Sequence, residues 1–240
     1  MKILGISAFY HDSAAALVCD GEIISAAQEE RFTRKKHDES FPTNAVKFCL
    51  ESNNLILEDI DFIVFYDKPF LKLERILETF YRNAPRGWRQ FVYSMPLWLK
   101  EKMFLKSTLK KALKEIGNFD KKKTKLLFSE HHLSHAASAF FCSSFKDAAI
   151  LCIDGVGEWA TASISKGVNN KIELLEEMHF PNSVGLLYSS SAYFLGFKVN
   201  SGEYKMMGLA PYGNPNASET IDFKEKIKSN LVQIFEDGSI

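Results

Sequence analysis

The sequence lacks three features that would place the protein in a particular class at once. No apolar run approaches the roughly 18 residues that would suggest a membrane helix. The opening residues, MKILGISAF, form too short an apolar stretch for a secretory signal. The 30 basic and 30 acidic residues cancel, so net charge gives no reason to expect nucleic acid or a membrane as a partner. We therefore expect a cytoplasmic protein.

Paired cysteines are also missing. The four cysteines stand at positions 19, 49, 142 and 152, and no two of them form a C-x-x-C motif. We expect reduced thiols packed among apolar side chains rather than a disulfide framework. Phenylalanine, in contrast, is abundant at 20 residues, so aromatic packing should supply much of the core.

Short apolar runs dominate the first part of the chain. Asp20-Gly21 is a strong hairpin signal between two of these runs. A helical pattern follows Pro42 and ends near Asn53. The expected strands cover residues 2–8, 13–19, 22–28 and 60–66. The first part therefore has the predicted order β-β-β-α-β.

Residues 68–120 have a different pattern, in which apolar residues alternate with charge at helical spacing. We expect a helical insertion that Pro85 and Pro96 break into pieces. Residues 68–125 contain 16 Lys or Arg and 5 Asp or Glu. This excess indicates either a solvated helical face or a docking surface for an anionic partner.

The β-β-β-α order then occurs a second time. A strand at 125–128 and a helix at 130–144 lead into this second copy. Its expected elements are strands at 147–154, 159–165 and 172–178 and a helix at 186–195. Such a duplication favours the actin-like, sugar-kinase-like ATPase fold, in which two ribonuclease-H-like subdomains hold a nucleotide between them.

We expect the first subdomain to span residues 1–145, with the insertion inside it, and the second to begin at 146. Up to residue 240 the second subdomain has too few strands for a complete sheet, and its last apolar stretch is VQIFEDG at 232–238. We expect the second subdomain to be incomplete. The alternative is a homodimer that closes the fold.

The segment EHHLSHAASAF carries the most specific chemical signal. His131 and His135 are four residues apart on a predicted helix, so both imidazoles share one face and can reach one metal ion. His132 points about 100° away. Asp154, at the end of a predicted strand, is a candidate third ligand. Two His and one Asp suit Fe(II) or Zn²⁺, although histidines that only hydrogen-bond within a core remain the alternative.

Three other segments contain candidate binding residues. Gly155 and Gly157 would let backbone amides approach a phosphate, although most D-G-x-G segments are plain turns. His11, in a loop between strands, is a candidate general base or an ordinary turn residue. A cationic cluster follows the third strand and could neutralise phosphate oxygens, or be a solvated loop; it contains Arg31, Arg34, Lys35 and Lys36.

Residues 201–213, SGEYKMMGLAPYG, have the pattern of neither a clean helix nor a strand. A long irregular segment in a compact domain is often functional. Lys205 is a candidate phosphate ligand and Glu203 a candidate ligand for a polar substrate. The alternative is a structural loop whose two methionines fill the core.

Together these motifs resemble the carbamoyltransferase family of nodulation-factor and aminoglycoside O-carbamoyltransferases. The N-terminal domain of that family is similar to the actin-like tRNA threonylcarbamoyl transferase subunit. The resemblance runs from residue 5 to residue 213 and is carried by GISAFYHDSAAALV, AAQEERFTRKKHD, HHLSHAASAFFCSSF, DGVGEWATASI and GEYKMMGLAPYG.

This resemblance implies a reaction and a division of labour. Carbamoyl phosphate and ATP give carbamoyl adenylate in a C-terminal domain, and the N-terminal domain passes the carbamoyl group to a hydroxyl of a small acceptor. No part of this chain matches the C-terminal domain, which we expect to act in cis or in trans. His131, His135 and Asp154 correspond to the family's metal ligands, with a further Asp beyond residue 240. His11 and Lys36 correspond to residues beside the carbamoyl group.

Two other functions fit parts of the same pattern. A sugar-kinase-like phosphotransferase would keep the fold and bind Mg²⁺ with its nucleotide, but carboxylates and water, not a His pair, are the usual ligands of Mg²⁺. Alternatively, the chain could bind metal, nucleotide or a partner without turnover, with the basic region 68–125 as its docking surface.

Overall fold

The computed structural model describes residues 1–119 and 123–236. The chain forms two compact units, Met1–Val184 and Gly185–Ile240. The first unit contains two separate sheets, and the predicted subdomain boundary at residue 145 falls between them. The described residues include no helix that is both long and apolar enough to cross a membrane.

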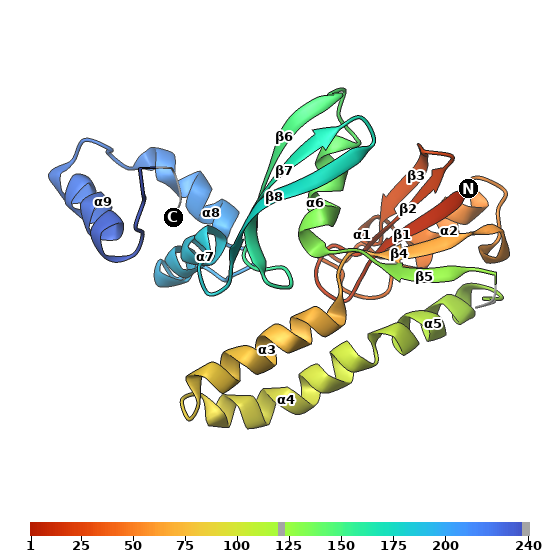
Figure 1. Cartoon of the computed structure of the whole chain (residues 1–240), viewed down its shortest axis with the longest axis horizontal. Coiled ribbons are helices and arrows are strands. Elements are labelled where there is room, and N and C mark those ends of the chain that lie inside the picture. The colour runs from red at the N-terminus through yellow and green to blue at the C-terminus, as the bar shows by residue number, and fades with distance from the viewer. Residues whose placement is uncertain (120–122, 237–240) are drawn as a thin grey trace. The chain divides into compact units, whose positions relative to one another are not determined.

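The first sheet is mixed and has the order β3-β2-β1-β4-β5 (Figure 1). Pairing is antiparallel between β1 and β2 and between β2 and β3, whereas β4 runs parallel to both β1 and β5. Both residues of the Asp20-Gly21 turn have positive φ, at 51° and 92°, which confirms the predicted hairpin. The strands are β1 (Lys2–Ser7), β2 (Ala14–Cys19), β3 (Glu22–Gln28), β4 (Phe62–Phe65) and β5 (Lys125–Phe128).

The main core lies against one face of this sheet. Alternate strand residues point to the same face of a sheet, so Leu4, Leu17, Ile63 and Phe65 are all buried together. Helix α2 (Thr43–Glu51) packs on β2 and β3 and contributes to this core. Helix α5 (Leu105–Ile116) buries leucines at positions 105, 109 and 113, one helical turn apart. The short elements α1 (Glu30–Thr33) and η1 (Leu57–Asp59) connect the strands.

The predicted helical insertion consists of α3 (Pro69–Asn83), α4 (Trp88–Met103) and α5. Pro85 separates α3 from α4, as predicted, but Pro96 lies inside α4, so the predicted break there is wrong. A proline removes one backbone hydrogen bond, and tertiary packing can outweigh that loss. Phe80 of α3 contacts Phe91 and Trp98, which lie on either side of Pro96, at ring distances of 5.0 and 5.9 Å.

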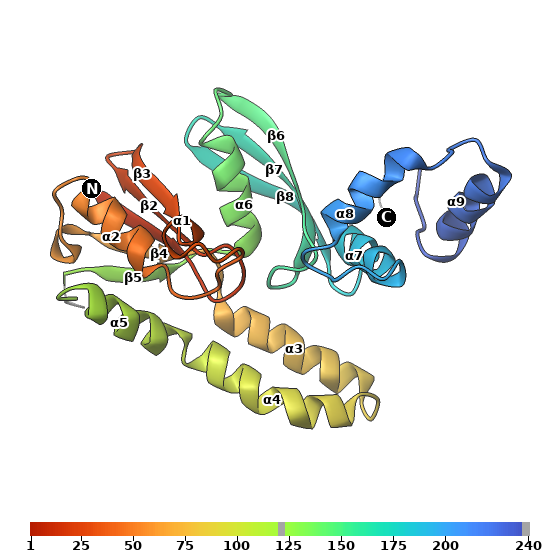
Figure 2. The same ribbon diagram turned by 180° about the vertical axis from the view of Figure 1, so that it is seen from behind.

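The second sheet is antiparallel and has the order β6-β7-β8, with strands Asp147–Ile153, Ala160–Val168 and Lys171–His179. Helix α6 (His131–Phe140) packs on this sheet, as both ribbon views show (Figures 1 and 2). Phe140 fits only because β7 has a glycine beneath it: a Cβ on Gly167 would lie 2.7 Å from the Phe140 ring. The two sheets with their helices confirm the predicted α/β class.

The second unit is helical. Its elements are most of α7 (Val184–Phe194), then α8 (Glu203–Leu209), η2 (Ala210–Tyr212) and α9 (Ser218–Asn230). The prediction of an irregular segment at 201–213 is therefore wrong. Met is a good helix former, and the Glu203 side chain accepts hydrogen bonds from the Asn200 and Gly202 amides at the start of α8. The described part of 232–238 contains no strand, and residues 237–238 lie outside the described residues.

Candidate metal centre

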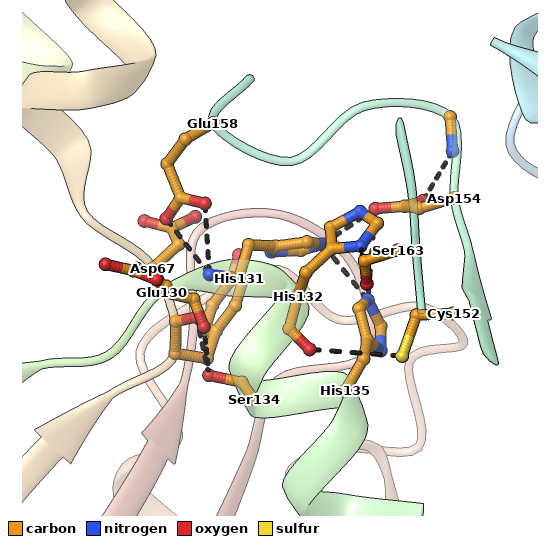
Figure 3. Close-up of polar contacts among 12 residues, drawn as sticks. Asp67, Glu130, His131, His132, Ser134, His135, Cys152, Asp154, Glu158 and Ser163 are labelled. Carbon is orange, nitrogen blue, oxygen red and sulfur yellow. Dashed lines mark hydrogen bonds and ion pairs between the residues drawn. The ribbon is translucent and has the colours of Figure 1, made fainter. Parts of the chain in front are cut away.

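The two predicted ligands on α6 point to the same place (Figure 3). The Nε2 atoms of His131 and His135 are 3.0 Å apart, because residues four apart on a helix lie one above the other. Asp154 follows β6, and its Oδ2 lies 2.7 Å from His131 Nε2 and 3.8 Å from His135 Nε2. Among the described residues, these three form a cluster whose ligand atoms all lie within 4.8 Å of one another.

The geometry of this cluster fits a metal ion. Ligand atoms that bind one tetrahedral Zn²⁺ at about 2.1 Å lie about 3.4 Å from each other. The three separations in the cluster, 2.7, 3.0 and 3.8 Å, bracket that value. Two imidazoles and one carboxylate supply three of the four ligands that a tetrahedral site needs.

The charge states at the centre also suit a cation. A hydrogen bond from His131 lowers the pKa of Asp154 to about 2, and the Gly155 amide adds a bond to the same carboxylate. Burial lowers the pKa of His135, so that its imidazole is neutral at pH 7. At neutral pH the cluster therefore presents an ionised carboxylate beside a neutral imidazole, the forms that bind metals.

The lowered pKa of Asp154 predicts how the stability of the metal-free protein depends on pH. Folding lowers this pKa from 3.8 to about 2, so the native state favours the ionised form. The resulting stability is complete above about pH 3.8 and is lost as the pH falls toward 2. The difference in free energy of unfolding between wild type and Asp154→Asn should therefore be smaller at about pH 3 than at about pH 5. Urea titrations at both pH values measure it; an equal difference at both would contradict the assignment.

The glycines of the turn after β6 lie beside the same centre. The Gly155 amide donates to Asp154 Oδ1 at 2.6 Å, and the Gly157 amide donates to the Ala160 carbonyl at 2.9 Å. Both amides thus have partners within the turn, and binding an anion there would require these bonds to open. Gly157 has a second effect, because the His131 ring packs directly against it.

We predict that Gly157→Ala weakens metal binding. A Cβ at this position would lie 3.0 to 3.2 Å from His131 side-chain atoms, so the imidazole must shift by a few tenths of an ångström and lose its alignment with the other ligands. We expect a loss of about tenfold or more, typical for a disturbed ligand. A Zn²⁺ titration by calorimetry measures it. Gly208→Ala is the matched control, because nothing lies within 4 Å of a Cβ there; equal affinities in both variants would contradict the prediction.

His132 points away from the centre, as the helical spacing predicted. Its Nδ1 lies 2.8 Å from Ser163 Oγ on β7, and the side chain is buried between α6 and the second sheet. Burial lowers the pKa of His132, which keeps this imidazole neutral. His132 is therefore a packing residue.

A second polar cluster joins the loop between β1 and β2 to the loop between α1 and α2. His11 Nδ1 is 2.7 Å from one oxygen of Asp12, and His37 Nδ1 is 3.0 Å from the other. One carboxylate thus orients two half-exposed imidazoles, and the sequence had pointed to only one of them. Lys36 is exposed beside His37. Asp12 and His37 both have positive φ, at 54° and 55°, a conformation that costs energy in a non-glycine residue.

Tyr66 borders the metal centre. Its ring is 5.7 Å from that of His131, and burial raises its pKa, so the phenol stays neutral. Tyr66 and Arg31 both line an open depression of about 840 Å³ over the face of the first sheet opposite the main core. Small residues form its floor, including Gly5, Ala14, Ala16 and Ala26. The metal ligands do not line this depression.

Glu203 and Lys205, the two candidate binding residues in the second unit, are described by their surroundings within that unit. The Glu203 carboxylate accepts hydrogen bonds from Ser189 Oγ at 2.8 Å and from the Asn200 amide at 3.0 Å. Lys205 is exposed on the same helix, α8. Substrate binding by Glu203 and phosphate binding by Lys205 stay predictions.

Glu158 is a site residue that sequence reasoning missed. It is buried and accepts hydrogen bonds from the His131 amide (Figure 3). Its position four residues after Asp154, in the same turn, is the only sequence signal that could have drawn attention to it.

Comparison with known proteins identifies the family. Residues 2–238 match the family model described as Carbamoyltransferase N-terminus. An uncharacterised protein of Synechocystis is 57% identical over 99% of this chain and 38% of its own length. Nodulation protein NolNO of Sinorhizobium fredii is 38% identical over 86% of this chain and 28% of its own length. An uncharacterised protein of Methanocaldococcus jannaschii is 30% identical over 91% of this chain and 35% of its own length.

The chain spans less than two fifths of the length of each of these relatives. The matched region nevertheless covers nearly the whole chain and includes every residue of the metal cluster. This chain therefore belongs to the carbamoyltransferase family, to whose N-terminal region it corresponds.

Proposed function

We propose that this chain is the transfer region of an O-carbamoyltransferase. It would move a carbamoyl group from carbamoyl adenylate, made from carbamoyl phosphate and ATP, to a hydroxyl of a small acceptor. Membership of the family supports carbamoyl transfer. The observation that carries the site assignment is the convergence of His131, His135 and Asp154 on one point, with their ligand atoms all within 4.8 Å of one another.

The proposed fold is actin-like. The first sheet supports it, because an antiparallel β1-β2-β3 meander is extended by the parallel strands β4 and β5. The second sheet repeats the antiparallel meander. In this proposal the two sheets belong to two related subdomains.

His131, His135 and Asp154 would hold Zn²⁺ or Fe(II), which would act as a Lewis acid toward a carbonyl or phosphate oxygen. His11 would be the general base. Asp12 accepts a hydrogen bond from His11 Nδ1, which leaves the Nε2 lone pair free to take a proton. The acceptor hydroxyl gives its proton to His11 Nε2 while its oxygen bonds to the carbamoyl carbon. The bond from that carbon to the phosphate oxygen breaks, and AMP leaves with the electron pair.

Cationic side chains would stabilise the negative charge that develops in this reaction. Lys36 lies next to His37, and Arg31 lines the depression that Tyr66 also borders. In this proposal the acceptor occupies that depression, so its hydroxyl would approach from the side of the β1–β2 loop. The Gly155–Gly157 turn, Lys205 and Glu203 remain candidate contacts for nucleotide and substrate.

The reaction can be tested with labelled carbamoyl phosphate. The chain alone, and the chain joined to the C-terminal region of the Synechocystis relative, are incubated with ATP, Zn²⁺ or Fe(II) and a panel of polyols. We expect labelled carbamate ester and AMP from the joined protein, and a loss of about 100-fold or more in its His11→Ala variant. Absence of product from every combination, or full activity without His11, would overturn the proposal.

A further inference from the structure

Glu158 is a buried carboxylate that the proposed reaction does not use. It lies in the turn between β6 and β7 and is only 6% exposed. Its Oε1 accepts a hydrogen bond from the Lys68 amide at 2.8 Å. The His131 amide donates to both of its oxygens, at 3.1 and 3.0 Å. One side chain thus joins three segments that are distant in the sequence.

Both helices that Glu158 reaches lack a cap of their own. Glu130, the N-cap residue of α6, makes no side-chain capping bond, and neither does Lys68, the N-cap residue of α3. The first amides of a helix have no partner within it, and a negative charge is favourable at this end. Glu158 therefore provides, from a distant turn, the acceptor that the local sequence of both helices omits.

This cap also fixes the metal centre. Asp154 and Glu158 belong to the same turn, and His131 is the residue whose amide Glu158 holds (Figure 3). The turn and α6 are thus fastened at two points: the Asp154 carboxylate on the His131 imidazole, and the Glu158 carboxylate on the His131 backbone. With the second point lost, the first turn of α6 could move relative to Asp154.

We infer that Glu158 is a positioning residue of the metal centre, which sets the distance between His131 and Asp154 through the backbone of α6. This inference rests on the metal site of the proposed function. Residues that orient metal ligands are typically worth about 10- to 100-fold in metal affinity. Glu158 should fall in that range although it touches no metal itself.

Glu29 offers a matched control. It is also buried, at 2% exposed, and it accepts hydrogen bonds from the Asn44 and Ala45 amides at the start of α2. The residue before α2, Pro42, provides no side-chain cap either. Glu29 therefore caps α2 in the same way as Glu158 caps α6. Of these two helices, only α6 carries metal ligands.

The test is a Co²⁺ titration of Glu158→Gln and Glu29→Gln, followed by visible absorption and by competition with Zn²⁺. Each substitution keeps the side-chain size but removes the charge and one acceptor oxygen. We expect Glu158→Gln to weaken Co²⁺ binding by about 10- to 100-fold and Glu29→Gln to leave it unchanged, although both lower the melting temperature. Wild-type affinity in Glu158→Gln, or an equal loss in both variants, would overturn the inference.

Amide hydrogen exchange in metal-free protein gives a second readout. Exchange at His131 should become faster in Glu158→Gln, and exchange at Ala45 faster in Glu29→Gln. Glu158→Asp, which keeps the charge but shortens the reach, should give an intermediate effect if Glu158→Gln does not fold. Failure of wild type to bind Co²⁺ or Zn²⁺ would count against the proposed metal function, whereas unchanged exchange at His131 would count against the role of Glu158 itself.

Discussion

Replacing His131, His135 or Asp154 singly should abolish tight binding of a divalent metal by this chain. Each contributes one ligand atom to a cluster that has only three such residues among those described. Loss of one residue leaves two ligand side chains, which are too few to surround the ion. We expect His131→Ala, His135→Ala and Asp154→Asn each to lower Zn²⁺ affinity by about 100-fold or more. Calorimetry and metal analysis of the purified proteins measure this effect.

His179→Ala is the control for these variants. His179 is a half-exposed histidine that pairs with Glu177 on β8 and has no contact with the cluster. Its removal should leave metal content and affinity unchanged. Wild-type metal content in the three ligand variants would show that these residues do not bind a metal. The proposed site would then lose its main support.

Replacing Phe65 by Ala should destabilise the first unit strongly. Phe65 is 2% exposed at the end of β4, and its ring contacts those of Tyr66 and Phe128 at 4.7 and 6.0 Å. Truncating a buried Phe removes its transfer free energy and leaves a cavity, which together cost about 3–5 kcal/mol. That is a large part of the stability of an ordinary domain. Urea unfolding followed by circular dichroism measures the loss.

Phe145→Ala is the matched control for this substitution. Phe145 is 67% exposed in the segment before β6, so the same change should alter the free energy of unfolding by less than about 0.5 kcal/mol. A loss in Phe65→Ala no larger than in Phe145→Ala would show that the core is not centred on β4. Metal binding should weaken in Phe65→Ala as well, because Tyr66 next to it borders the centre.

Features that depend on neighbours in the sequence could be predicted. The Asp20-Gly21 hairpin follows from the preference of those residues for positive φ. The strands of both sheets follow from short apolar runs. Their observed ends lie within three residues of the expected ones. The shared face of His131 and His135 follows from the period of the helix alone.

Apart from the candidate ligand Asp154, the features that depend on contacts between distant segments could not be predicted. Pro96 gave a local signal for a break, and Phe80 of another helix outweighed it. His37 was passed over because its partner, Asp12, is 25 residues away and only the packing of two loops brings them together. The helix at 203–209 was missed because nearby glycines obscured a run of good helix formers.

The sequence alone determined which side chains share a helix face, where the chain turns and which family motifs are present, because these depend on backbone geometry over a few residues. Tertiary structure decided that Asp154 meets the two histidines, that Gly157 must leave room for the His131 ring, and that Glu158 caps two helices from one turn. Such arrangements depend on how separate segments pack, and spacing along the chain carries little information about that packing.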